Sequence, residues 1–110
     1  MSEVLVAFCT FPDVDRAAAV TKELVGQRLV ACGNILPGIQ SIYRWHDAVE
    51  SSEEVLAIFK LDASRYAEFE RKVRSIHPYE VPEIIALPIS KGLPEYLGWV
   101  ADSCAGGSVR

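Results

Sequence analysis

Three short stretches of this sequence are apolar at every position, and each has the length of a β-strand. They are Val4–Cys9, Val55–Phe59 and Ile84–Leu87. A strand with one solvated face alternates apolar and polar residues, whereas a continuous apolar run is typical of a strand buried on both faces. Any fold of this chain must therefore cover both sides of its sheet.

Helical patterns separate these apolar runs. Apolar residues recur at helical spacing from 14 to 25. A second helical pattern starts near Asp62 or Ser64 and ends before Pro78, and a third starts at Pro94. The resulting order is strand, helix, strand, strand, helix, strand, helix. It predicts an α+β fold: a ferredoxin-like split βαβ domain (βαββαβ) with an antiparallel sheet and an added C-terminal helix.

The segment between the first two helices is unusually long for a pair of strands. It extends from Leu29 to Lys60, breaks at Pro37-Gly38, and continues over Ile39–Trp45 into a polar stretch, His46–Ser52, that we expect to be a hairpin loop. A typical strand has roughly 5–6 residues. A hairpin that outgrows its sheet, with Tyr43-Arg44-Trp45 near its tip, exposes aromatic surface and free edges, which pairing with a neighbouring subunit would protect.

The two longer helices of such a fold cover one face of the sheet and leave the other face open. The continuous apolar runs require cover on that second face as well. The helix predicted from Pro94 is too short to cover a whole sheet. We expect self-association to supply the cover; the alternative is that the third helix and the loops suffice.

The composition fits one globular domain. The chain has 110 residues, 50% of them hydrophobic and 24% charged, and we assign residues 1–110 to a single domain with a frayed tail over 105–110. A formal net charge of −4 argues against a general nucleic-acid binder, whose affinity comes largely from cationic side chains on phosphates.

The lack of a recognisable targeting signal and the pattern of cysteines predict a cytoplasmic protein. No apolar stretch approaches the about 20 residues of a membrane helix, and Met1-Ser2-Glu3 lacks the basic residues of a secretory signal. The three cysteines form no CxxC pair. Without a signal peptide, free thiols in a reducing cytoplasm are the expectation.

The densest polar cluster is the loop His77–Glu83, which contains two prolines. Because the first strand of this fold is central and the fourth is its antiparallel neighbour, Cys9 at the end of the first strand should lie near His77. A thiolate and an imidazole suit copper or zinc, and Glu80, Glu83, water or a second subunit would complete the site. The alternatives are that the prolines only end a helix and start a strand, with His77 as a cap, and that Cys9 is a small buried hydrophobe.

Little in the sequence indicates catalysis. Cys9 and His77 could act as nucleophile and base, but no glycine-rich oxyanion loop accompanies them. The chain also lacks the CxxC of metallochaperone domains and the phosphate cradle of acylphosphatases after the first strand. Glu54–Phe59 lacks the aromatic–basic pattern of RNA-recognition domains. We therefore expect a binding protein and not an enzyme.

Several motifs, in this order, resemble the CutA family of divalent-cation tolerance proteins. They are Cys9-Thr10 with Pro12-Asp13, Leu29–Ile35 (LVACGNI), Ser41–Trp45 (SIYRW), His77–Ile84 (HPYEVPEI) and Tyr96–Trp99 (YLGW). The resemblance extends from about Val4 to Ser103.

This resemblance implies a tight homotrimer of ferredoxin-like subunits, with the sheets gathered inside and the long hairpins embracing neighbours. It also implies a cytoplasmic protein involved in tolerance of copper and other divalent cations, with Cys9 and His77 as the proposed copper ligands. The chain has Ile76 where some members have a second histidine, and His46-Asp47 where many have a glycine after Trp45.

A second function is compatible with the same resemblance. It is a trimeric scaffold, similar in shape to PII-like signalling trimers, that binds a small molecule or a partner protein in clefts between subunits. Tyr43, Trp45, Tyr79 and Glu80 would line the cleft, with Arg44 at the interface.

Overall fold

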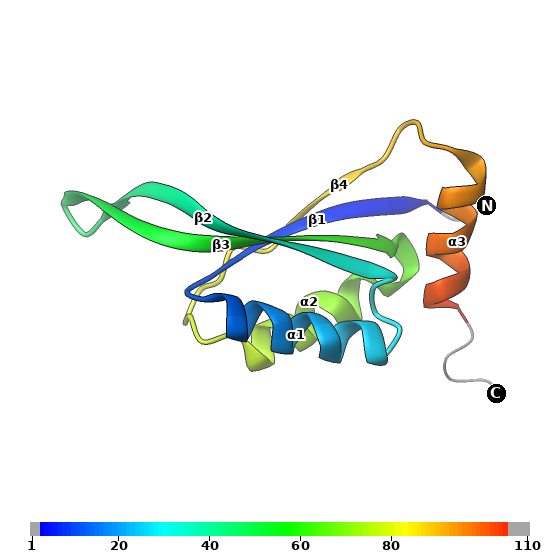
Figure 1. Cartoon of the computed structure of the whole chain (residues 1–110), viewed down its shortest axis with the longest axis horizontal. Helices are drawn as coiled ribbons and strands as arrows, with labels where there is room; N and C mark the ends of the chain where they lie inside the picture. Colours follow the sequence, from blue (N-terminus) through cyan, green and yellow to red (C-terminus); the bar gives the residue numbers. More distant parts are fainter. Residues whose placement is uncertain (1–2, 106–110) are drawn as a thin grey trace.

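The structure, a computed structural model, describes residues 3–105 and has a four-stranded antiparallel sheet at its centre (Figure 1). The strand order is β2-β3-β1-β4. In chain order the strands are β1 (Val4–Phe11), β2 (Cys32–Trp45), β3 (Ala48–Asp62) and β4 (Ile85–Pro88). This order confirms the predicted ferredoxin-like topology, with β1 in the interior of the sheet between β3 and β4.

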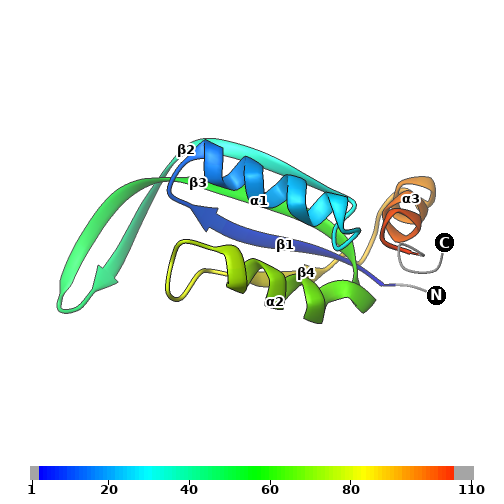
Figure 2. The ribbon, with the colours of Figure 1, turned by 90° about the horizontal axis from the view of Figure 1, so that it is seen from below.

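Three helices complete the fold. Helices α1 (Val14–Gly26) and α2 (Tyr66–Ile76) lie side by side on one face of the sheet (Figures 1 and 2). A short 3-10 turn, Ala63–Arg65, leads into α2. Helix α3 (Pro94–Cys104) lies at the end of the sheet away from the hairpin (Figure 2). Of the predicted tail 105–110, all but the first residue lie outside the described residues.

Aspartate side chains cap the first turn of α1 and the 3-10 turn before α2. The Asp13 carboxylate accepts a hydrogen bond from the Arg16 backbone N–H at 2.8 Å and caps α1. The Asp62 carboxylate accepts from the Ser64 backbone N–H at 3.0 Å and caps the turn that opens into α2. Each cap satisfies a backbone donor that has no partner within its own helix.

The core lies between the sheet and helices α1 and α2. Alternate residues of β1 and β3 point into it and are fully buried: Ala7, Cys9, Phe11, Ala57, Phe59 and Leu61. Gly33 of β2 faces α1, and a Cβ atom there would lie 2.7 Å from Thr21 Cγ2 and 2.9 Å from Phe59 Cδ1. Only glycine therefore fits this close approach of strand and helix without displacing its neighbours.

The opposite face of the sheet is also apolar and lies largely open. Cross-strand partners place Val6, Phe8, Leu36, Leu56, Ile58, Ile85 and Leu87 on it. Leu36, Ile85 and Leu87 are 41%, 54% and 55% exposed. Helix α3 reaches only its end, where the Tyr96 hydroxyl lies 3.7 Å from Cys32 Sγ. The strands are therefore apolar on both faces, as their sequence indicates, and α3 leaves much of the second face uncovered.

Strands β2 and β3 extend beyond the rest of the sheet as a long two-stranded arm (Figure 1). The predicted loop over His46–Ser52 is wrong: the turn is only His46-Asp47, and β3 starts at Ala48, opposite Trp45. This stretch is polar because no helix packs on the arm and its side chains are exposed to solvent, and not because it forms a loop. A bulge between Leu36 and Ile39, with Gly38 at φ 78°, divides the sheet part of β2 from the arm.

Two other expected boundaries shift. The extended segment predicted from Leu29 enters β2 only at Cys32, and its buried first residues are joined to β3 by the Ala31 N–H to Lys60 carbonyl hydrogen bond at 2.8 Å. The last strand starts at Ile85, one residue inside the apolar run Ile84–Leu87, and ends at Pro88. Within residues 3–105 no helix has the length and apolar character needed to cross a membrane.

Candidate functional site

Cys9 lies on β1, opposite Ala57 of β3, and its side chain is fully buried on the helix side of the sheet. Burial, together with the charges of Glu83 and Glu54, raises the pKa of the Cys9 thiol to about 12. The thiol is therefore protonated at neutral pH. The thiolate, and not the thiol, is the form that binds metals.

His77 is the C-cap of α2, and its ring is buried at the end of β1. Its Nδ1 accepts a hydrogen bond from the Tyr79 backbone N–H at 3.0 Å, so Nε2 carries the proton and donates to the Thr10 carbonyl at 2.7 Å. The ring also stacks on Phe11, with centroids 4.5 Å apart. Burial lowers the pKa of His77 below its usual value, although the Thr10 carbonyl opposes this. The neutral imidazole uses both nitrogens within the protein.

His77 lies against Thr10, the residue after Cys9, but the present arrangement of Cys9 and His77 does not fit a metal ion. Ligation would require Cys9 to lose its proton and His77 to give up one of its two hydrogen bonds. Within residues 3–105 no three His, Cys, Asp or Glu side chains lie close enough together to hold a metal.

A groove of about 950 Å³ lies on the other side of β1, between the arm and the loop that follows α2. We call it the acidic groove. It contains five of the predicted cleft and site residues: Tyr43, Trp45, Tyr79, Glu80 and Glu83. Its full lining is Thr10, Ser41, Ile42, Tyr43, Trp45, Glu50, Ser52, Glu54, Tyr79, Glu80, Val81 and Glu83.

Several lining residues were not predicted from the sequence. Glu50, Ser52 and Glu54 alternate along β3 and share one face of the arm. Their spacing of two is the signal of a strand, but it is obscured when this stretch is interpreted as a loop. Arg44, predicted at the same interface, is paired with Val49 and is not part of the groove lining.

One hydrogen bond joins the two walls of the acidic groove. The Tyr79 hydroxyl donates to Glu54 Oε2 at 2.6 Å, which connects the loop after α2 to strand β3. Burial raises the pKa of Tyr79 above its usual value, and the Glu54 carboxylate adds to the shift. Tyr79 therefore stays a neutral donor, and the short contact is a charge-assisted hydrogen bond.

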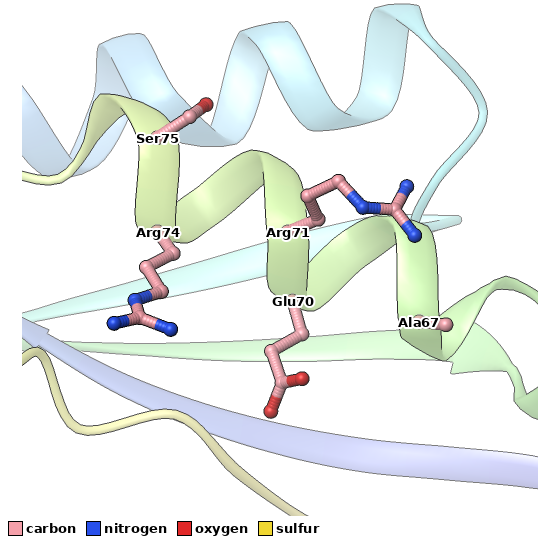
Figure 3. A pocket seen from close by; sticks show the side chains of 5 residues that line it. All are labelled: Ala67, Glu70, Arg71, Arg74 and Ser75. Atoms are coloured by element: carbon pink, nitrogen blue, oxygen red, sulfur yellow. The ribbon is translucent and has the colours of Figure 1, made fainter.

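A second concavity lies on the exposed side of α2 and is lined by Ala67, Glu70, Arg71, Arg74 and Ser75. Figure 3 shows that Arg71 and Arg74 extend in different directions and that Ser75 points away from both. The Ser75 hydroxyl already donates to the Lys72 carbonyl at 2.7 Å. These side chains do not converge on a common point, so the acidic groove is the stronger candidate.

Comparison with known proteins agrees with the fold and the motifs. The family model described as "CutA1 divalent ion tolerance protein" matches residues 5–103. The chain belongs to this family. It is 42% identical over 98 residues to "Divalent-cation tolerance protein CutA" of Thermus thermophilus, covering 89% of this chain and 95% of that protein. It is 44% identical over 97 residues to "Protein CutA" of Mus musculus, covering 88% of this chain but 55% of the mouse protein.

A solved structure shows the same similarity in three dimensions. The "Periplasmic divalent cation tolerance protein CutA" from Archaeoglobus fulgidus matches with a TM-score of 0.87 and 33% identity, covering 94% of this chain and 99% of that chain. The name of that CutA relative places it in the periplasm. The cytoplasmic location expected for the present chain therefore stays a prediction.

Proposed function

We propose that this CutA chain acts in divalent-cation tolerance as a binding protein and not as an enzyme, and that the acidic groove is its site for positively charged ligands. The observation that carries the proposal is the groove lining. Carboxylates from β3 and from the loop after α2 face a common space together with aromatic rings. Such a concave site with a few convergent polar groups is typical of ligand binding.

A thermal-shift screen tests the groove. We expect cationic compounds to raise the melting temperature of the protein, because a ligand that binds only the folded state stabilises it. Trp45→Ala should abolish the shift, since Trp45 lines the groove. Trp99→Ala is the matched control, because Trp99 lies on α3 outside the groove lining. Equal loss in the two variants would contradict the proposal.

We further propose that the working form is a homotrimer. The open sheet face supports this, because apolar side chains such as Ile85 and Leu87 are more than half exposed there and a face of this kind needs cover. The projecting arm would lie against a neighbouring copy, with the acidic groove left open as a cleft between subunits. Light scattering should give about three times 12.1 kDa. A mass near 12.1 kDa would refute the trimer.

A second candidate site, for copper, consists of Cys9 and His77. The observation in its favour is the hydrogen bond from His77 Nε2 to the carbonyl of Thr10, the residue after Cys9. Copper would have to displace the Cys9 proton and one hydrogen bond of His77, so its affinity should rise with pH. Calorimetry should then show weaker copper binding in Cys9→Ala and in His77→Ala. Unchanged stoichiometry in the double variant would exclude this pair.

A further inference from the structure

The charge of the acidic groove is uniform in sign. Its four carboxylates belong to Glu50, Glu54, Glu80 and Glu83, and no lysine, arginine or histidine is among the described residues that line it. Carboxylates around a common space repel one another, whereas a cation between them is attracted to all of them. The groove therefore favours a positively charged ligand.

The distribution of these carboxylates favours a molecule over a bare ion. Among residues 3–105, no three potential ligand side chains are close enough to hold one metal ion. A divalent ion takes several oxygen ligands at about 2.0–2.6 Å, so a single ion cannot use the separated carboxylates together. The groove volume of about 950 Å³ is in the range of small-molecule sites. An elongated molecule with several positive groups can reach carboxylates that one ion cannot.

Aromatic rings provide a second kind of contact. Tyr43, Trp45 and Tyr79 line the groove, and Tyr43 and Trp45 are 41% and 60% exposed. Ammonium groups interact favourably with the faces of tryptophan and tyrosine, and an alkyl chain packs against the same rings. A strongly hydrated metal ion gains little from such walls.

Thr10 is an independent observation at the same place. Its side chain lines the groove and is only 9% exposed. No residue in 3–105 makes a hydrogen bond to its hydroxyl, although its backbone carbonyl accepts from His77. This oxygen is not among the fully buried polar atoms without a partner, so it is accessible from the groove. A ligand N–H group in the groove would give this oxygen its partner.

We infer that the acidic groove binds an organic cation, an aliphatic amine with two or more ammonium groups, in preference to a bare metal ion. Carboxylates would receive the ammonium groups, the rings would pack on the chain between them, and Thr10 would accept an N–H hydrogen bond. This inference rests on the proposed function, because it names the class of ligand taken by the same groove.

Fluorescence titration of the full chain tests this inference. In a Trp99→Phe background Trp45 is the only tryptophan, so its emission reports on the groove. Spermidine, Mg²⁺ and uncharged 1,8-octanediol are titrated separately at low salt, where charges are least screened. We expect spermidine to bind at least tenfold more tightly than Mg²⁺, and octanediol to leave the emission unchanged.

Two neighbouring glutamates provide the matched variants. Glu54→Gln removes a charge from the groove and should weaken spermidine binding about tenfold. Glu53→Gln removes the same charge from the adjacent residue of β3, which is not part of the groove lining, and should weaken binding less than twofold. Equal weakening in the two variants would overturn the inference, because it would indicate attraction to any acidic surface.

The remaining outcomes separate the inference from the proposed function. If Mg²⁺ binds as tightly as spermidine and Glu54→Gln weakens Mg²⁺ binding, the preference for an organic cation is wrong and the groove stays a cation site. If neither ligand changes the emission of Trp45 at millimolar concentration, the inference and the proposed function both fail.

Discussion

Replacing Gly33 with alanine should destabilise the protein by about 2–3 kcal/mol, the upper part of the range for adding a methyl group to a packed core. The new Cβ would lie 2.7 Å from Thr21 Cγ2 and 2.9 Å from Phe59 Cδ1, whereas carbon atoms in contact prefer about 3.5–4.0 Å. Phe59 cannot turn aside freely, because its ring packs edge-on against Phe69 at 5.5 Å. Both a helix and a strand must therefore shift.

Urea unfolding at one fixed protein concentration measures this loss, since the stability of an oligomer depends on concentration. Gly98→Ala is the control: Gly98 lies inside α3, and a Cβ there would have no atom within 4 Å. Alanine at that position should stabilise the helix by about 0.5–1 kcal/mol. If Gly33→Ala changed the free energy of unfolding by no more than the control, the close approach of β2 to α1 would not be what requires glycine.

Three further predictions concern the site residues. Burial lowers the pKa of His77 below 6.5, so the folded protein favours the neutral ring. The contribution of His77 to the free energy of unfolding should be complete above pH 6.5 and be lost as the pH falls through the pKa of the folded state. A pH dependence of unfolding that is unchanged in His77→Gln would contradict this. Tyr79→Phe removes the donor to Glu54 and should cost about 1–2 kcal/mol in urea unfolding, whereas Tyr96→Phe should cost less than half as much. Burial raises the pKa of Cys9 to about 12, so mass spectrometry should show Cys9 unmodified by iodoacetamide at pH 8 in the folded protein and modified in urea; equal rates would disprove its burial.

The sequence was sufficient for the topology because the relevant signals are local. Continuous apolar runs, helical spacing and capping residues such as Asp13 and Asp62 each depend on neighbours in the chain. The same topology rule brought His77 to the end of β1, where it is hydrogen-bonded to the Thr10 carbonyl. These features were therefore predictable without coordinates.

The acidic groove and the protonation state of the Cys9 thiol were less predictable, because both depend on contacts between segments that are distant in the sequence. Polar composition made 46–52 resemble a loop, yet cross-strand pairing extends β3 to Ala48 and gives Glu50 and Glu54 a common face. The sequence also suggested Cys9 as a metal ligand, but could not show that burial on the helix side keeps its thiol protonated. Burial depends on what packs against a residue, and a one-dimensional pattern does not contain that information.

The bulge in β2 keeps Arg44 out of the acidic groove. One extra residue between Leu36 and Ile39 reverses the alternation of side chains, so odd-numbered residues of the arm, including Tyr43 and Trp45, share a face with the even-numbered Leu36. If β2 paired with β3 in regular alternation from Leu36 onward, with no bulge and no residue removed, Arg44 would lie on the groove side in place of its aromatic neighbours. The preference of this surface for cations thus depends on the bulge, which keeps a guanidinium off the groove face, as well as on the glutamates themselves.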